Sequence, residues 1–160
     1  MPVREARRAD LEALLDQLER LNATGTEADP RYRIRSGARD FLREHHGETW
    51  FGRFQPFPAC LVDERDGVLA GFVSGAPRQD HPVLDHPPTA RIGELWVEPA
   101  YRRQGVARAL VTAFRERCAR AGYADVEVST LARDARAVAF WRSVGFDDLR
   151  LVLLATPPAG

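Results

Sequence analysis

The stretch from Ala90 to Leu131 constrains the fold more than any other part of the sequence. It reads as a strand over Ala90–Val97, a helix over Gly105–Ala121 and a second strand over Asp125–Leu131. One face of the helix is apolar, formed by Val106, Leu110, Ala113, Phe114 and Cys118. Gly122 then supplies a typical helix end. Such a unit predicts two parallel strands joined by a right-handed crossover.

The residues before this unit predict a strand and two helices. Val3–Arg8 reads as a short strand, and Asp10 is a candidate N-cap for the first helix. That helix carries a leucine stripe of Leu11, Leu14, Leu15, Leu18 and Leu21, which is too short for a coiled coil and predicts a core-facing surface. Asn22–Arg35 contains glycine and proline and reads as a loop. Ser36 then predicts the cap of a short helix that ends near His45.

A hairpin is predicted in the middle of the chain. Ala59–Val62 and Val68–Ser74 are strand-like, and the polar run between them ends in Asp66-Gly67, a pair that tolerates the positive φ of a tight turn. The proline-rich segment Ala76–Thr89 reads as a loop. Trp50–Pro58 is aromatic and interrupted by proline, and it has no clear assignment.

Two further elements follow the crossover unit. Asp134–Val144 predicts a helix that ends at Gly145, and Leu149–Ala155 predicts a last strand. The 160 residues suit one domain, spanning residues 1–160, with a single sizeable core.

The composition excludes several classes of protein. The 23 basic and 23 acidic residues balance, which argues against a nucleic-acid-binding surface. All basic residues are arginine, so no lysine can act as a base or form a Schiff base. No apolar run approaches the ~20 residues of a membrane helix, and the charged opening segment predicts no secretory signal. Cys60 and Cys118 are far apart in sequence and indicate neither a metal site nor a disulfide framework, so a cytoplasmic protein is expected.

The segment from Leu95 to Arg108 carries the candidate chemistry. A strand ends, Pro99 prevents its simple continuation, and a short turn leads into a helix that begins near Gly105. N–H groups at a helix start lack partners within the helix, and with the helix dipole they favour a phosphate. The alternative is a strand–turn–helix corner with solvated arginines. The segment has neither the lysine of a Walker loop nor the three glycines of a dinucleotide loop.

The motif Arg102-x-x-Gly105-x-Ala107 resembles the acetyl-CoA signature of the GNAT family of N-acetyltransferases. A second segment, Asp134-x-x-Ala137-x-x-Phe140-Trp141-x-x-x-Gly145-Phe146, is similar to a downstream motif of the same family. The resemblance implies an α/β (α+β) fold with a mixed, mostly antiparallel sheet. Its fourth and fifth strands would be parallel and would splay apart, with about four helices around the sheet and acetyl-CoA between the splayed strands.

The resemblance also implies which residues hold the cosubstrate acetyl-CoA, without any metal. The backbone of Leu95, Trp96 and Val97 would contact the pantetheine arm. The pyrophosphate would be held, chiefly through backbone amides, by Arg102, Arg103, Gln104, Gly105, Val106, Ala107 and Arg108. Asp134 and Trp141 would lie near the coenzyme. Asp134 stands where the family has Asn, but it can still cap a helix.

Glu94 is the candidate catalytic base, because an attacking amine must lose a proton. Strand alternation predicts that Ile92, Glu94 and Trp96 share one face. Glu94 as a structural acid is the alternative, and His81 or His86 in the preceding loop is another candidate base. The family often has tyrosine as the acid where this chain has Trp141, whose indole cannot act as a general acid at neutral pH. We expect Trp141 to pack in the core, and His45-His46 to be a solvated pair.

The expected activity is direct acetyl transfer from acetyl-CoA to a primary amine of a small molecule or peptide. Acidic residues near the first helix (Glu27, Asp29) and the aromatic stretch Trp50–Phe57 suit a cationic or partly apolar amine. The alternative is a catalytically weak or inactive acyl-CoA-binding sensor. Membrane and nucleic-acid partners are not expected. A homodimer is possible, with Leu149–Leu154 either at a subunit contact or in the sheet.

Overall fold

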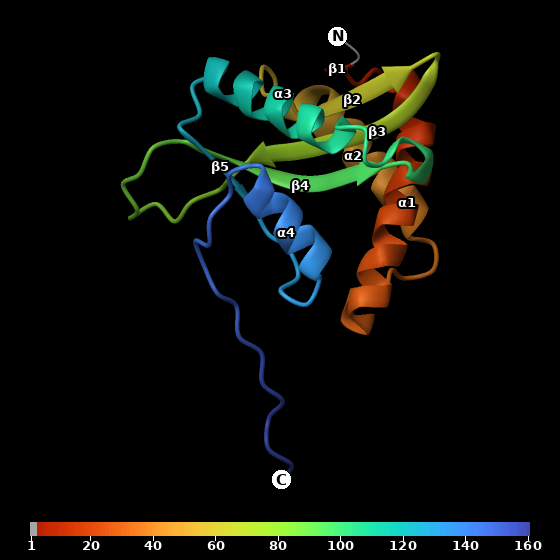
Figure 1. The fold of residues 1–160 in the computed structure, drawn as a ribbon. Helices are drawn as coiled ribbons and strands as arrows, with labels where there is room; N and C mark the ends of the chain where they lie inside the picture. Colours follow the sequence, from red (N-terminus) through yellow and green to blue (C-terminus); the bar gives the residue numbers. More distant parts are fainter. Residues whose placement is uncertain (1–2) are drawn as a thin grey trace.

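Five strands form one mixed sheet in the computed structural model, which describes residues 3–160 (Figure 1). They lie side by side in chain order: β1 (Val3–Glu5), β2 (Cys60–Arg65), β3 (Val68–Pro77), β4 (Thr89–Val97) and β5 (Asp125–Val128). Neighbours from β1 to β4 are antiparallel, and β4 and β5 are parallel. The mostly antiparallel sheet with one parallel pair is therefore confirmed.

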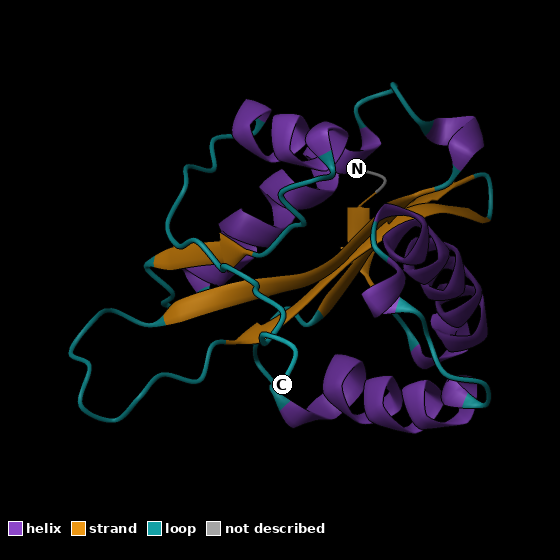
Figure 2. Ribbon diagram, turned by 90° about the horizontal axis from the view of Figure 1, so that it is seen from below, coloured by secondary structure: helices purple, strands orange, loops and turns teal. Residues whose placement is uncertain are grey.

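Four α-helices cover the two faces of this sheet (Figure 2). They are α1 (Leu11–Ala28), α2 (Ala38–Glu48), α3 (Val106–Arg120) and α4 (Ala135–Ser143). Short turns precede or join them: η1 (Arg8–Asp10), η2 (Pro30–Tyr32), η3 (Thr49–Arg53) and η4 (Pro99–Tyr101). The helix over the crossover and the helix after β5 both lie where the sequence predicts them.

Two apolar cores lie on opposite faces of the sheet. Leu61 and its β3 partner Val73 pack with α3 and α4, whereas the adjacent pair, Val62 and Phe72, packs with α1 and α2. The centre of the predicted leucine stripe is buried in the second core, and Cys118 is buried in the first. The period-2 alternation of the strands thus divides the side chains between two helical layers.

A β-bulge at Gly93 decides which side chains of β4 face which core. Gly75 of β3 pairs with Ile92, but the preceding β3 residue pairs with Glu94, so Gly93 is an extra residue on β4. Ile92 therefore packs in the α3/α4 core, while Glu94 and Trp96 face the α1/α2 side. The prediction that Ile92 shares their face is wrong, because the bulge reverses the alternation.

Helix α1 continues past the point where the sequence predicts a loop. Gly25 lies inside the helix, and its carbonyl accepts a hydrogen bond from the N–H of Asp29 (2.9 Å). The helix ends just before Pro30, which has no N–H and disfavours a helical residue before it. The predicted loop over Asn22–Arg35 is therefore wrong for its first half, up to Ala28.

Both helices on this face begin differently from the prediction. The Asp10 side chain does not cap α1; it accepts a hydrogen bond from the N–H of Arg7 (2.7 Å) and pairs with Arg4 (2.8 Å). At α2 the N-cap is Gly37, with a φ of 77°, instead of Ser36. The left-handed turn at Gly37 leaves the serine hydroxyl one residue too early to cap the helix.

The segment Leu149–Ala155 is not a strand, contrary to the prediction. It pairs with none of the strands in residues 3–160, and it runs away from the sheet (Figure 1). The large apolar side chains of this segment are 70% to 83% exposed: Leu149, Leu151, Val152, Leu153 and Leu154. An apolar pattern indicates strand propensity, but a strand forms only against a neighbouring sheet edge.

His46 is buried, so the prediction of a solvated histidine pair is wrong for this residue. Its side chain is only 6% exposed, and its ring stacks on Trp50 with centroids 4.1 Å apart. Burial lowers the pKa of His46 to about 4, and the charge of His45 contributes in the same direction. His46 is therefore neutral in the folded protein near neutral pH.

We expect the variant His46→Phe to lose less stability than the wild type as the pH falls from 6.5 to about 4. The unfolded chain takes up a proton at histidine near pH 6.5, whereas folded His46 resists protonation, so the stability present above that pH is lost as the pH falls. Thermal unfolding followed by circular dichroism across this range measures the effect. His81→Phe, at an exposed loop position, is the control, and an unchanged pH dependence in His46→Phe contradicts the expectation.

Candidate active site

The parallel strands β4 and β5 diverge beyond their first residues. Their pairing runs from Thr89–Asp125 to Ile92–Val128 and stops there, although β4 continues to Val97. On its other edge β4 stays paired with β3 as far as Val97. The backbone edge from Gly93 to Val97 on the β5 side is therefore not covered by any strand of residues 3–160.

The predicted cofactor residues Leu95, Trp96 and Val97 lie on this uncovered edge. Leu95 and Val97 turn their side chains into the α3/α4 core, and Trp96 turns its ring into the α1/α2 core. These three residues therefore present backbone N–H and C=O groups, and not side chains, on the open edge. The carbonyl of Val97 accepts a hydrogen bond from the Nε of Arg102 (3.0 Å), so one of these groups already has a partner.

The turn after β4 leaves a run of backbone N–H groups without acceptors. Arg103 has a φ of 60°, and Gly105, the N-cap of α3, has a φ of 79°. Within residues 3–160, no acceptor lies against the N–H groups from Arg103 to Arg108. The N-terminus of α3 adds the positive end of its dipole at the same place. This arrangement favours an anion with several oxygen atoms, such as a diphosphate.

The side chains around this turn mostly contact the protein itself. The Arg102 guanidinium lies 4.8 Å from the centroid of the Trp96 ring, and the Gln104 amide donates to the Ala100 carbonyl (2.9 Å). Arg108 donates to the carbonyl of Ser143 (3.3 Å). Arg103 contacts none of the described residues through a hydrogen bond or ion pair. The capacity of the turn to bind an anion therefore resides mainly in its main chain.

Glu94 lies on β4 next to the uncovered edge, with Ser74 of β3 as its paired residue. The Ser74 hydroxyl donates a hydrogen bond to the Glu94 carboxylate, and Ser74 itself is fully buried. Burial raises the pKa of Glu94 above its usual value, while the Ser74 hydrogen bond and the charge of His45 oppose part of the increase. A carboxylate with a raised pKa is suited to take a proton from an amine.

Sequence reasoning missed Ser74. A serine in a buried strand carries no signal of its own, and only the register between β3 and β4 shows that it faces Glu94. That register includes the bulge at Gly93, which strict alternation does not reveal.

We expect Ser74→Ala to raise the pKa of Glu94 further, because the variant removes a hydrogen bond that stabilises the ionised carboxylate. A carbon-13 NMR titration of the Glu94 carboxyl group measures the pKa directly. Ser143→Ala, which alters an exposed hydroxyl on α4, is the matched control. A pKa of Glu94 that is unchanged or lower in Ser74→Ala would show that the hydroxyl does not act on this group.

Asp134 and Trp141 occupy structural positions at α4. Asp134 caps the helix by accepting a hydrogen bond from the N–H of Ala137 (3.0 Å), as predicted. Trp141 is 9% exposed and packs edge-to-face with Phe146, with centroids 5.2 Å apart. The expectation that Trp141 packs in the core is confirmed, and no hydroxyl replaces the tyrosine of the resembled motif at this position.

Other candidates from the sequence lie in different surroundings. His86 pairs with Asp80 in the loop before β4, and the Pro87 carbonyl and Asp80 raise the pKa of His86. Trp50 and Phe57 are buried in the two cores, so they support the fold instead of lining an open acceptor pocket. Asp29 is also buried, and its carboxylate pairs with arginines on two segments.

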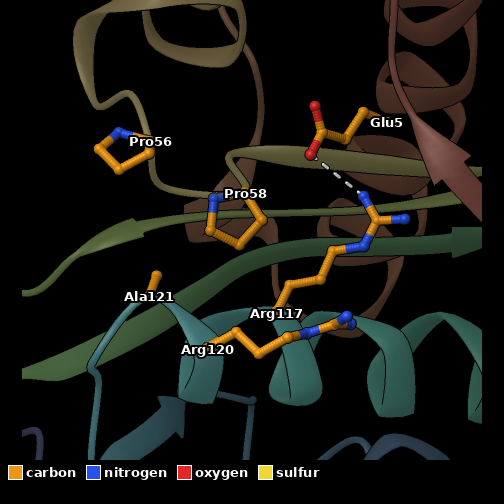
Figure 3. Close-up of a pocket in the computed structure, with 6 residues that line it drawn as sticks. All are labelled: Glu5, Pro56, Pro58, Arg117, Arg120 and Ala121. Atoms are coloured by element: carbon orange, nitrogen blue, oxygen red, sulfur yellow. Dashed lines mark hydrogen bonds and ion pairs between the residues drawn. The ribbon is translucent and has the colours of Figure 1, made fainter.

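A surface pocket lies away from this site, between the start of the chain and the end of α3. Its lining includes Glu5, Pro58 and Arg117, with an ion pair of 3.2 Å between Glu5 and Arg117 (Figure 3). Residues 3–160 contain no group of three or more His, Cys, Asp or Glu side chains placed to hold a metal ion. Among the helices of the same residues, none is both long and apolar enough to cross a bilayer.

The chain is similar to known proteins in its sequence and in its fold. The sequence model of the acetyltransferase (GNAT) family matches residues 14–146. No curated protein sequence matches the chain.

Solved structures share the fold at low sequence identity. The aminoglycoside N-acetyltransferase AAC(6')-Iy in complex with CoA is 19% identical, covers 98% of this chain and 94% of its own, and has a TM-score of 0.76. A mutant of the BH1408 protein from Bacillus halodurans is 17% identical and has a TM-score of 0.83. The match covers 99% of this chain and 100% of that protein. An aminoglycoside acetyltransferase from an uncultured soil metagenomic sample, in complex with sisomicin, is 19% identical and has a TM-score of 0.68. The match covers 98% of this chain and 95% of that protein.

Proposed function

The chain belongs to the GNAT acetyltransferase family, and we propose that it transfers an acetyl group from acetyl-CoA directly to a primary amine of a small molecule or peptide. The observation that carries this proposal is the run of acceptor-free N–H groups from Arg103 to Arg108, next to the uncovered edge of β4. Glu94, with its raised pKa, lies on the same strand.

The site fits acetyl-CoA, the cosubstrate of this enzyme. The amides of the turn and the start of α3 suit its diphosphate, and the uncovered backbone from Gly93 to Val97 suits the amides of its pantetheine arm. Arg103, which is exposed and has no partner among the described residues, can add a positive charge beside the phosphates. Acetyl-CoA supplies the thioester that the amine attacks.

Direct transfer is favoured over a covalent enzyme intermediate. Burial raises the pKa of Cys118 to about 12 and raises that of Cys60 well above its usual value, so neither thiol supplies a thiolate. In the proposed reaction Glu94 accepts the proton of the ammonium group, and the neutral amine attacks the thioester carbonyl. The C–N bond forms and the C–S bond breaks, the acylated nitrogen loses its second proton to water, and coenzyme A leaves as a thiolate that takes a proton from water.

The amine is to be identified by assay with a panel. We propose polyamines, amino acids, peptide N-termini and sisomicin as test acceptors; sisomicin is the ligand of one of the similar structures. The release of free thiol from acetyl-CoA reports turnover, and mass spectrometry of the acceptor reports its acetylation. Thiol release with an acetylated amine supports the proposal.

The buried position of Trp141 favours a second candidate function. Trp141 stands where a tyrosine hydroxyl could protonate the leaving thiolate, and its indole cannot do so. The protein would then be a catalytically weak or inactive acyl-CoA-binding module. Calorimetric binding of acetyl-CoA without thiol release for any amine on the panel would support this function. Failure to bind acetyl-CoA would contradict both.

We further propose that the enzyme acts in the cytoplasm as a homodimer. Both of its cysteines are free and buried, which suits a reducing compartment. The exposed apolar segment that follows α4 supports the dimer.

A further inference from the structure

The bulge at Gly93 places Arg91 on the same face of the sheet as Glu94. The two residues are three apart, so regular alternation would turn them to opposite faces, and the extra residue between them removes this difference. Their partners on β3, Ala76 and Ser74, are two apart. Two positions along a strand span about 7 Å. Arg91 and Glu94 are therefore neighbours on the α1/α2 side of the sheet.

Arg91 is held in place from β5. It is paired with Glu127 in the parallel ladder, and its Nε lies 3.3 Å from Oε1 of that residue. Its Nη2 donates a hydrogen bond to the Ser129 hydroxyl (3.3 Å). Arg78 lies closer to the Glu127 carboxylate, with Nη1 and Oε2 2.7 Å apart. Glu127 therefore positions Arg91 but shares its negative charge between two guanidinium groups.

The Arg91 guanidinium keeps donors that a ligand can use. The side chain of Arg91 is 46% exposed, whereas that of its partner Glu127 is only 10% exposed. Within residues 3–160, Nη1 of Arg91 contacts no hydrogen-bond or ion-pair partner. A guanidinium group binds a carboxylate through two parallel hydrogen bonds, and its charge does not depend on pH near neutrality. The surface beside Glu94 thus offers a fixed positive charge with free N–H groups.

Arg91 also lies close to where the thioester would be attacked. The last pair between β4 and β5 is Ile92–Val128, and the uncovered edge that suits the pantetheine arm begins at Gly93. Arg91 precedes this edge by two residues, and Glu94 lies on it. An acceptor on the α1/α2 side can therefore place its amine at Glu94 while another of its groups contacts Arg91.

We propose that Arg91 selects acceptors that carry a carboxylate as well as the primary amine, such as amino acids. The carboxylate accepts hydrogen bonds from the guanidinium, and the amine faces Glu94, which takes its proton. One positive and one negative side chain on the same face match the two charges of such an acceptor. The inference rests on the acetyl transfer proposed above and narrows its small-molecule acceptors to zwitterionic amines.

Matched pairs of acceptors test this selection. They are glycine and glycinamide, β-alanine and β-alaninamide, and γ-aminobutyrate and its amide, and thiol release from acetyl-CoA gives kcat/KM for each. The preference for the carboxylate member is expected to fall about tenfold in Arg91→Gln for at least one pair. Because the amines are the same for both enzymes, this change does not depend on their basicity.

Two further variants complete the kinetic test. Arg91→Lys keeps the charge but not the fork of donors, so it should retain part of the preference. Arg43→Gln is the matched control, because Arg43 is 40% exposed and pairs with Glu12 of α1. Its preference should equal that of the wild type. A preference that is unchanged in Arg91→Gln overturns selection by Arg91, and thiol release then still supports acetyl transfer.

Nitrogen-15 NMR of the Arg91 side chain gives a reading that needs no turnover. The Nε–H signal of Arg91 is assigned by its loss in Arg91→Gln. With coenzyme A present, this signal should shift when γ-aminobutyrate is added and stay in place when its amide is added. A shift without thiol release for any amine supports the role of Arg91 and overturns acetyl transfer. The absence of both thiol release and a shift overturns both.

Discussion

Gly105→Glu is expected to weaken acetyl-CoA binding by on the order of a hundredfold or more. The new carboxylate would sit at the N-terminus of α3, where it would accept hydrogen bonds from the free amides and repel the diphosphate. No atom lies within 4 Å of a Cβ at this position, so the side chain meets no obstacle. The φ of 79° adds backbone strain that must be separated from the charge.

Gly37→Glu provides that separation. Gly37 is the N-cap of α2 with φ 77° and ψ 4°, nearly the same conformation as Gly105 with φ 79° and ψ 4°. Both variants introduce the same side chain at a helix start with the same strain, but only one lies at the turn after β4. Calorimetric titration with acetyl-CoA should show weakened binding for Gly105→Glu alone. Equal affinities in the two variants would mean that the diphosphate binds elsewhere.

Glu94→Gln is expected to lower kcat by about a hundredfold or more, because general base catalysis typically contributes ~10²–10⁴-fold. Affinity for acetyl-CoA should change little, since the carboxylate serves the amine. The control is Glu64→Gln, which removes a carboxylate on β2 that pairs with Arg4. A kcat near that of the wild type would require another base or none.

The same substitution should leave the fold more stable at alkaline pH. Burial holds the pKa of Glu94 above its usual value, so the folded protein binds the proton more tightly than the unfolded chain does. Stability contributed by this group is therefore present at low pH and is lost as the pH rises through the folded pKa. Glutamine does not ionise, so thermal unfolding of Glu94→Gln should occur at a higher temperature than that of the wild type above this pKa. A lower unfolding temperature would show that the ionised carboxylate supports the fold.

The crossover unit could be predicted from the sequence because its signals are local. The apolar face of α3, the glycine after it and the turn following Pro99 all depend on neighbouring residues, and the structure places them as predicted. The cap at Asp134 is local in the same way. The free amides near Gly105 follow directly from a helix start.

The remaining features depend on contacts that the sequence does not display. Gly25 suggests a loop, yet α1 continues through it until Pro30. His46 reads as polar, but the ring of Trp50 covers it. The strand propensity of Leu149–Ala155 is visible, whereas the lack of a neighbouring edge is not. Ser74 became a candidate only when the register placed it opposite Glu94.

The extra residue in β4 also bears on how this protein can vary in length. Deleting Gly93 would restore simple alternation and leave the Glu94 carboxylate facing α1 and α2, as it does now. Deleting or inserting one amino acid between Glu94 and Val97, where the pairing with β3 is regular, would instead turn either the carboxylate or the ring of Trp96 into the apolar layer beneath α3. The proline-rich loop just upstream, by contrast, is exposed over most of residues 79–88 and can gain or lose residues without changing which way any strand residue points. Across relatives of this chain, gaps should therefore accumulate in that loop and be rare between Glu94 and Val97.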